Sequence, residues 1–150
     1  MKTCFKNGRV VLILRGRFAG SKAIILTKSS DFDQNSVQTF ILAGIQKYPQ
    51  LVTRKMSLKK ISKKSRMKIF IKKINMNHVF PTRFFIDLNK TTDKLVNEKI
   101  EDFRDFIGKK IENKEIFSKE KQVFSSFLKN IFLDQFFSGK QKWFFKKLRF

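Results

Sequence analysis

The chain has few of the side chains that build metal centres and disulfides. Among its 150 residues are one cysteine, Cys4, and one histidine, His78. A single cysteine forms no intramolecular disulfide, and His78 has no second metal ligand beside it in the sequence. We therefore expect no disulfide framework, no metal site and a reducing compartment.

Long apolar runs and catalytic motifs are also missing. No run approaches the ~20 residues that span a bilayer, and the short VVLIL run (10–14) is closed by Arg15. We expect neither a membrane span nor a secretion signal. The sequence contains no Gly-Lys-Ser/Thr phosphate loop, no His-Glu-x-x-His motif and no Cys–His pair. It therefore predicts no enzyme, no cofactor and no small-molecule substrate.

Acidic residues are absent from a long stretch of the chain. Between Gln34 and Ile86 there is no Asp or Glu against twelve Lys and Arg, whereas ten of the twelve acids lie from Asp87 to Asp134. The formal net charge is +22. Charge of one sign at this density destabilises a compact chain unless a polyanion neutralises it. The change of composition places a domain boundary near residues 87–93.

Five short β-branched or alternating runs precede that boundary. They cover residues 9–14, 22–26, 37–45, 66–74 and 82–88, with a polar loop at 29–36. In the fourth run Met67, Ile69 and Ile71 point one way, and Lys68, Phe70 and Lys72 are expected to face outward. The pattern predicts a mainly β domain over residues 1–92, a small, partly closed barrel with a basic extension.

The hydrophobic period changes after the boundary. Apolar residues recur at helical spacing from Val96 to Ile111, and again from Val123, in a stripe that includes Phe124, Phe127, Phe132 and Phe136. Gly139 stands where a helix C-cap is expected. We predict two amphipathic helices over residues 93–138, followed by a tail at 139–150.

The acid-free stretch contains the strongest candidate for a binding site. Residues 54–73 hold ten cations in twenty positions, and clustering of a single sign favours a polyanion over a merely solvated face. His78 and Arg83 follow it. A lone histidine is more often structural, but here stacking of His78 on an RNA base and bridging of phosphates by Arg83 are also plausible roles.

The C-terminal tail interleaves cations with aromatic rings. Its sequence is GKQKWFFKKLRF, and it holds no acid side chain. We predict that the tail is mobile in the free chain and is ordered only on RNA, where its rings stack on bases or fill gaps. The alternative is that Trp143 and its neighbours close the core of the barrel.

Several stretches resemble one family. The tail matches the C-terminal signature of the "L twenty-seven e" family of eukaryotic cytosolic large-subunit ribosomal proteins, with Gln141 in place of the usual Asn. Residues 8–26 are similar to its KOW segment, whose fixed glycine corresponds to Gly20. FILAGIQKYPQLVT (40–53) and the NHVFPTR stretch (77–83) also match. Residues 98–138 depart from the family, being more apolar and more acidic.

The resemblance implies an SH3-like barrel and helices bound to ribosomal RNA, in a structural constituent of the large subunit that supports translation. Neighbouring large-subunit proteins are further expected partners, and the expected location is the cytoplasmic ribosome after assembly in the nucleolus. The expected RNA-binding residues are Arg15, Arg17, Lys22, Lys47, Arg54, Lys55, Lys59, Lys60, Lys63, Lys64, Arg66, Lys68, His78, Arg83, Lys140, Lys142, Trp143, Phe144, Phe145, Lys146, Lys147, Arg149 and Phe150.

Two other functions fit parts of the sequence. One is a KOW-containing transcription factor or RNA chaperone, which binds RNA transiently. The other is a basic protein lying on an anionic membrane through the Phe stripe of its last helix, although the polar face of that helix is not notably basic.

Overall fold

A computed structural model describes residues 4–29, 38–86, 98–99, 102–103, 106 and 114–149. Its strands are β1 (Arg9–Ile13), β2 (Lys22–Ser29), β3 (Thr39–Lys47), β4 (Lys68–Asn75) and β5 (Val79–Phe85). Its helices are α1 (Leu58–Lys64), the short 3-10 helix η1 (Met76–His78) and α3 (Lys114–Phe137). All five predicted strands are present, and most of the predicted loop at 29–36 lies outside the described residues.

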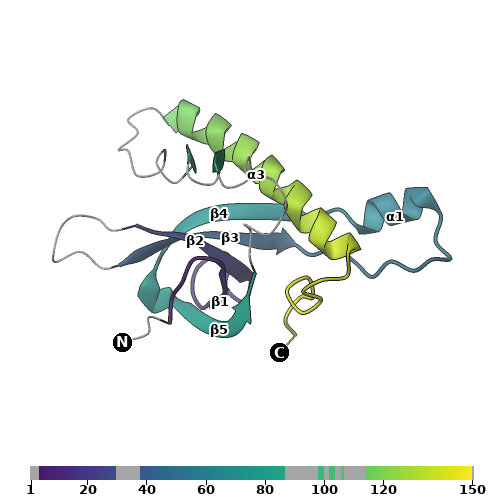
Figure 1. Cartoon of the computed structure of the whole chain (residues 1–150), viewed down its shortest axis with the longest axis horizontal. Coiled ribbons are helices and arrows are strands. Elements are labelled where there is room, and N and C mark those ends of the chain that lie inside the picture. Colours follow the sequence, from purple (N-terminus) through teal and green to yellow (C-terminus); the bar gives the residue numbers. More distant parts are fainter. Residues whose placement is uncertain are drawn as a thin grey trace.

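The strands form one antiparallel sheet in the order β4-β3-β2-β1-β5. The two edge strands, β4 and β5, follow each other in the chain and are joined by η1, and the sheet curls between them (Figure 1). Gly20 ends the turn between β1 and β2 at a φ of 75°, a conformation that favours glycine, and its N–H donates to the Ile13 carbonyl at 2.8 Å. The predicted small open barrel is confirmed.

Most of β2 and β3 is buried on both faces, because apolar side chains occupy alternating and intervening positions alike, whereas the edge strand β5 buries only Val79. Val11, Ile25 and Leu42 belong to an inner cluster made almost entirely of strand residues and Phe18. Val10 and Ile24 belong to an outer cluster that also contains α3 and tail residues. We call these two sets the inner core and the outer core.

One expectation about β4 is corrected by this arrangement. Phe70, expected to face outward with Lys68 and Lys72, is buried in the inner core, where its ring stacks on Phe18 at 3.9 Å and 3°. The alternation itself is right. Lys68 and Lys72 share the inner side of the strand but remain exposed, since β4 is an edge of the open barrel.

Helix α3 covers the outer face of the sheet (Figure 1). Its buried face consists of Phe124, Leu128, Ile131 and Phe132. The helix ends as predicted at Gly139, whose φ is 69°; Gly139 N–H donates to Phe136 O and Lys140 N–H to Gln135 O, the bonds of a Schellman motif.

This packing weakens the membrane interpretation, because the apolar stripe of α3 already lies against the sheet. No helix in the described parts of the chain has the length and apolarity to cross a membrane.

Most of the predicted first helix (from Val96 to Ile111) lies outside the described residues. The five described positions between 98 and 106 are helical. Phe103 is buried and stacks on Phe124 at 3.8 Å and 16°, which links this segment to α3. The short α1 was not predicted, because the sequence indicated only a charged run there.

We expect Phe132→Ala to lower the free energy of unfolding by about 3–5 kcal/mol, since it leaves a cavity in the outer core. Chemical denaturation of the free chain measures this. Phe137→Ala removes the same ring from a position that is 59% exposed, and it should change stability by no more than about 0.5 kcal/mol. Equal effects of the two changes would contradict the packing of α3 on the sheet.

Candidate nucleic-acid interface

The segment between β3 and β4 leaves the body of the protein and returns to it (Figure 1). We call residues 49–66 the basic arm. It is anchored at both ends, because Tyr48 packs against the outer core and Met67 belongs to it. Within the arm, Gln50 N–H donates to Lys64 O at 2.9 Å and Met56 N–H to Thr53 O at 3.1 Å. These backbone bonds hold the arm as a turned loop that contains α1.

Helix α1 has seven residues and buries none of them. A helix this short is marginal in water, and Ser57 at its N-cap makes no side-chain hydrogen bond. Lys63 and Lys64 in its last turn complement the helix dipole. The arm therefore contributes little apolar burial to folding while it presents its charges to solvent.

The arm holds the largest group of predicted RNA-binding cations. It contains no acid. All of its cations are exposed except Lys64, which is half-buried: Arg54, Lys55, Lys59, Lys60, Lys63, Lys64 and Arg66. At its base Lys47 and Lys68 are register partners on β3 and β4, and both are exposed. Like charges placed opposite each other repel, and a polyanion would relieve that repulsion.

A second basic group surrounds the turn between β1 and β2. Arg15 and Arg17 are exposed there. The Arg17 guanidinium lies 4.7 Å from the centroid of the buried Phe18 ring, and Lys72 Nζ lies 5.9 Å from the same centroid. Phe18 thus closes this end of the inner core and positions cations beside it. Lys72 was not among the predicted binding residues.

Lys22 has a different role from the predicted one. Its side chain is 1% exposed, and its ammonium donates to the Trp143 carbonyl and, at 2.5 Å, to the Lys146 carbonyl. It also lies 4.0 Å from the centroid of the Trp143 ring. An amine committed to these partners does not contact a phosphate. Lys22 instead joins β2 to the C-terminal tail.

The surroundings of Lys22 change its acid–base behaviour. Burial, and to a smaller extent the charge of Lys146, lower the pKa of the Lys22 amine to about 8. The Lys22 backbone N–H donates to the Tyr48 hydroxyl at 2.9 Å. Burial raises the pKa of the Tyr48 phenol, and this hydrogen bond acts in the opposite direction.

The tail rings lie in the outer core. Phe144 and Phe145 are 1% and 4% exposed, and Phe132 meets both rings edge to face, at 5.4 and 6.4 Å. Trp143 is half-buried and stacks on Phe84 at 4.4 Å. In this arrangement Phe144 and Phe145 are closed to RNA bases, and the tail is packed on the barrel in the free chain. This packing agrees with the alternative interpretation of the tail, in which Trp143 and its neighbours close the core.

The tail cations point away from that core. Exposed cations of the tail are Lys140, Lys142, Lys146, Lys147 and Arg149. Phe150 lies outside the described residues. The tail therefore buries rings on one side and presents positive charge on the other.

His78 and Arg83 do not form one site. His78 is half-buried at the end of η1, and its carbonyl accepts from Leu14 N–H at 2.9 Å. Arg83 is exposed on β5, with its guanidinium 5.4 Å from the Phe84 ring centroid. His78 thus belongs to η1 and Arg83 to the strand that follows it.

The comparisons with known proteins agree with these features. The model of the ribosomal L27e protein family matches residues 10–150. The chain is 39% identical to the large ribosomal subunit protein eL27z of Arabidopsis thaliana, over the full length of both chains.

The chain belongs to the ribosomal L27e protein family. The resemblance found in the sequence is confirmed, and with it the prediction of a structural ribosomal protein that is not an enzyme. Membership also disfavours the transcription-factor and membrane interpretations. Among the described residues, no group of three or more His, Cys, Asp or Glu side chains is placed to hold a metal ion.

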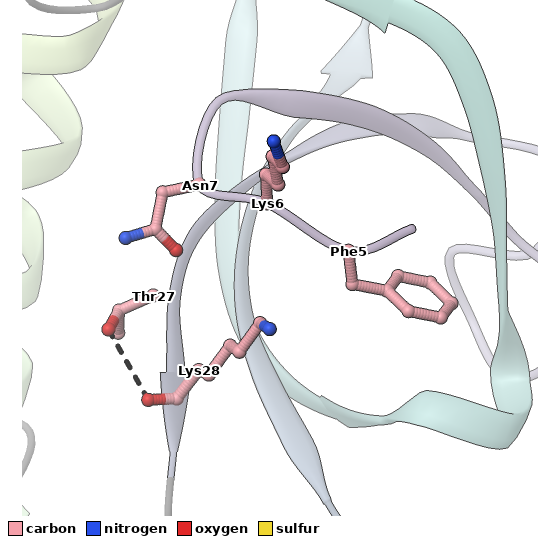
Figure 2. Close-up of a pocket in the computed structure, with 5 residues that line it drawn as sticks. All are labelled: Phe5, Lys6, Asn7, Thr27 and Lys28. Carbon is pink, nitrogen blue, oxygen red and sulfur yellow. Dashed lines mark hydrogen bonds between the residues drawn. The ribbon is translucent and has the colours of Figure 1, made fainter. Parts of the chain in front are cut away.

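The sequence did not reveal a shallow hollow in this L27e family member. Its volume is about 330 Å³, and it is lined by Phe5, Lys6, Asn7, Thr27 and Lys28 (Figure 2). Thr27 Oγ1 donates to the Lys28 carbonyl at 3.3 Å. The lining residues come from two segments about twenty positions apart, and Gly8 N–H donating to Ile25 O helps to bring them together. No motif signals a site built in this way.

We expect a truncation ending at Ser138 to lower the melting temperature before any RNA is added. It removes two buried Phe rings and uncovers Phe132 and Lys22, a loss of at least ~3 kcal/mol. Differential scanning calorimetry of the free protein measures it. The matched control is Lys140→Ala with Lys142→Ala, which alters only exposed charges. A truncated chain that melts like the parent would show that the tail is not part of the core.

Lys22 also predicts a dependence of stability on pH. Between about pH 8 and 10.5 the unfolded chain keeps a proton that the folded chain has lost at Lys22, so this group makes the unfolding free energy rise with pH. Across this pH range the free energy of unfolding of the parent should therefore rise by about 1–3 kcal/mol relative to that of Lys22→Met. Urea titrations at several pH values measure it, and a constant difference would contradict the lowered pKa.

Proposed function

We propose that this L27e family member is a structural constituent of the large ribosomal subunit and binds ribosomal RNA chiefly through its basic arm. Placement in the large subunit is supported by the name of its relative, a large ribosomal subunit protein. A net charge of +22 supports a polyanionic partner. Assembly in the nucleolus and work in cytoplasmic ribosomes are part of the same proposal.

The observation that carries the proposal is the exposure of the arm. Seven cations without an acid stand on a segment that buries almost nothing. Such a segment lowers the stability of the free chain by self-repulsion and gains stability when phosphates neutralise it and counterions are released. Lys47 and Lys68 extend this surface to the base of the arm, and Arg15 and Arg17 form a separate contact beside Phe18.

The tail contributes to RNA binding through its cations. With Phe144 and Phe145 packed against Phe132, stacking of these two rings on bases is no longer proposed. The exposed cations of the tail remain candidate phosphate contacts, and Phe150 remains a candidate RNA contact. Neighbouring large-subunit proteins are further proposed partners, and Val123 and Phe137 are exposed apolar positions on α3 that suit such contacts.

Replacing Lys59, Lys60, Lys63 and Lys64 by Ala should flatten the log–log dependence of RNA affinity on salt. Four lost phosphate contacts at ~0.7–0.9 each reduce the slope by roughly 3. Fluorescence anisotropy with a labelled ribosomal RNA fragment at a series of salt concentrations gives this slope. The control is Lys119→Ala with Lys129→Ala, which removes exposed charges from α3 and should change the slope by less than about 1. An unchanged slope in the arm variant would refute the proposed role of the arm.

A further inference from the structure

Leu12 on β1, Leu14 just beyond the end of β1 and Phe80 on β5 form an apolar surface on the outer side of the sheet, in which Leu14 and Phe80 are exposed and Leu12 is half-buried. Leu12 on β1 is the register partner of Phe80 on β5, so the two lie side by side on one face. Leu14 is two positions beyond Leu12 and follows on the same face. Phe80 is 56% and Leu14 is 54% exposed. We call Leu12, Leu14 and Phe80 the β5 platform.

Two exposed rings of β5, Phe80 and Phe85, are not paired with another ring among the described residues, whereas rings such as Phe18 and Phe144 are. The Phe85 ring lies against Gly8. Phe80 stands on a strand that is hydrogen-bonded to β1, so its backbone is fixed before any partner arrives. An exposed ring held on a rigid sheet is a suitable surface for stacking a base.

The charges near the β5 platform indicate which class of partner binds there. Leu12 pairs with Lys22 on its other side, so Phe80 lies two strands, about 10 Å, from the place where the tail is bound. The tail presents Lys146 and Lys147 there, and Arg15 follows Leu14 in the chain. No acid occurs in the described parts of the barrel, residues 4–29 and 38–86. In the described barrel and tail all charged side chains are cations, which favours a nucleic-acid strand over an apolar protein surface as the partner.

We propose that Phe80 stacks on an unpaired base of RNA, with Leu12 and Leu14 packing beside it and the nearby cations holding the adjacent phosphates. This rests on the proposed RNA-binding function and adds to it a single-stranded contact. The basic arm contacts phosphates whether or not the strand is paired. The β5 platform needs a base that has left its helix.

The test compares a 12-nucleotide RNA without self-complementarity with the same RNA paired to its full complement as a blunt duplex, both bound to the full chain. Phe80→Ala should weaken binding of the single strand about five- to 150-fold and leave duplex binding and the salt slope unchanged. Phe80→Trp should retain the affinity of the parent or exceed it. Phe137→Ala, the matched loss of an exposed ring on α3, should have no effect.

Phe80→Leu separates stacking from simple apolar contact, because it keeps apolar area and loses the ring. We expect it to bind the single strand nearly as weakly as Phe80→Ala. Parent-like affinity of Phe80→Leu or of Phe80→Ala for the single strand would overturn the proposal, and so would an equal loss on the duplex. Thermal melting confirms that each variant is folded. If the affinity of the parent for both RNAs lacked a steep salt dependence, the proposed RNA-binding function would be wrong. If the parent had a steep salt dependence and Phe80→Ala bound the single strand as tightly as the parent, only the role of the β5 platform would be wrong.

Discussion

The structure depends on burial of the outer face of the sheet. Small barrels bury their inner face, but here the outer positions of β1 to β4 are also apolar and need a cover. Helix α3 supplies part of it and the tail supplies the rest, through Phe132, Phe144 and Phe145. Since burial of an aromatic side chain contributes on the order of 1.5–3 kcal/mol, this second core is a large part of what holds a chain of charge +22 together.

This burial also determines where the charged side chains lie. With apolar side chains filling both faces of the sheet, cations are left to edge strands, turns, the arm and the outward side of the tail. Lys22 is the exception, and its ammonium is satisfied by two carbonyls and the Trp143 ring. A buried amine without such partners would be costly. The hydrogen bonds from the Lys22 ammonium to the tail carbonyls reduce the cost of burying this charge, and they also hold the tail on β2. The segment with the strongest family signature is therefore also part of the core.

Much of the fold was predictable because strand alternation and helical spacing are local properties. All five strands, the change to helix and the C-cap at Gly139 followed from residue order. The roles of Lys22 and Phe70 did not, because each depends on a partner far away in the sequence. Lys22 meets a tail more than 120 positions away, and Phe70 faces inward because Phe18 and the curl of the sheet enclose it. The exposure of Phe80 could not be read from the sequence either, because Val10, Val11 and Ile13 on the neighbouring strand β1 are equally apolar and are buried.

The sequence by itself determined the class of the protein: its polyanionic partner, the absence of catalytic motifs, the barrel-then-helix order and the family, all of which are written in composition, period or local motif. Tertiary structure decided which aromatic rings and cations are available to that partner. The reason is physical. A ring or an ammonium has the same chemistry wherever it stands, but its accessibility depends on what packs against it, and in this protein the tail covers Lys22 while it leaves Phe80 open.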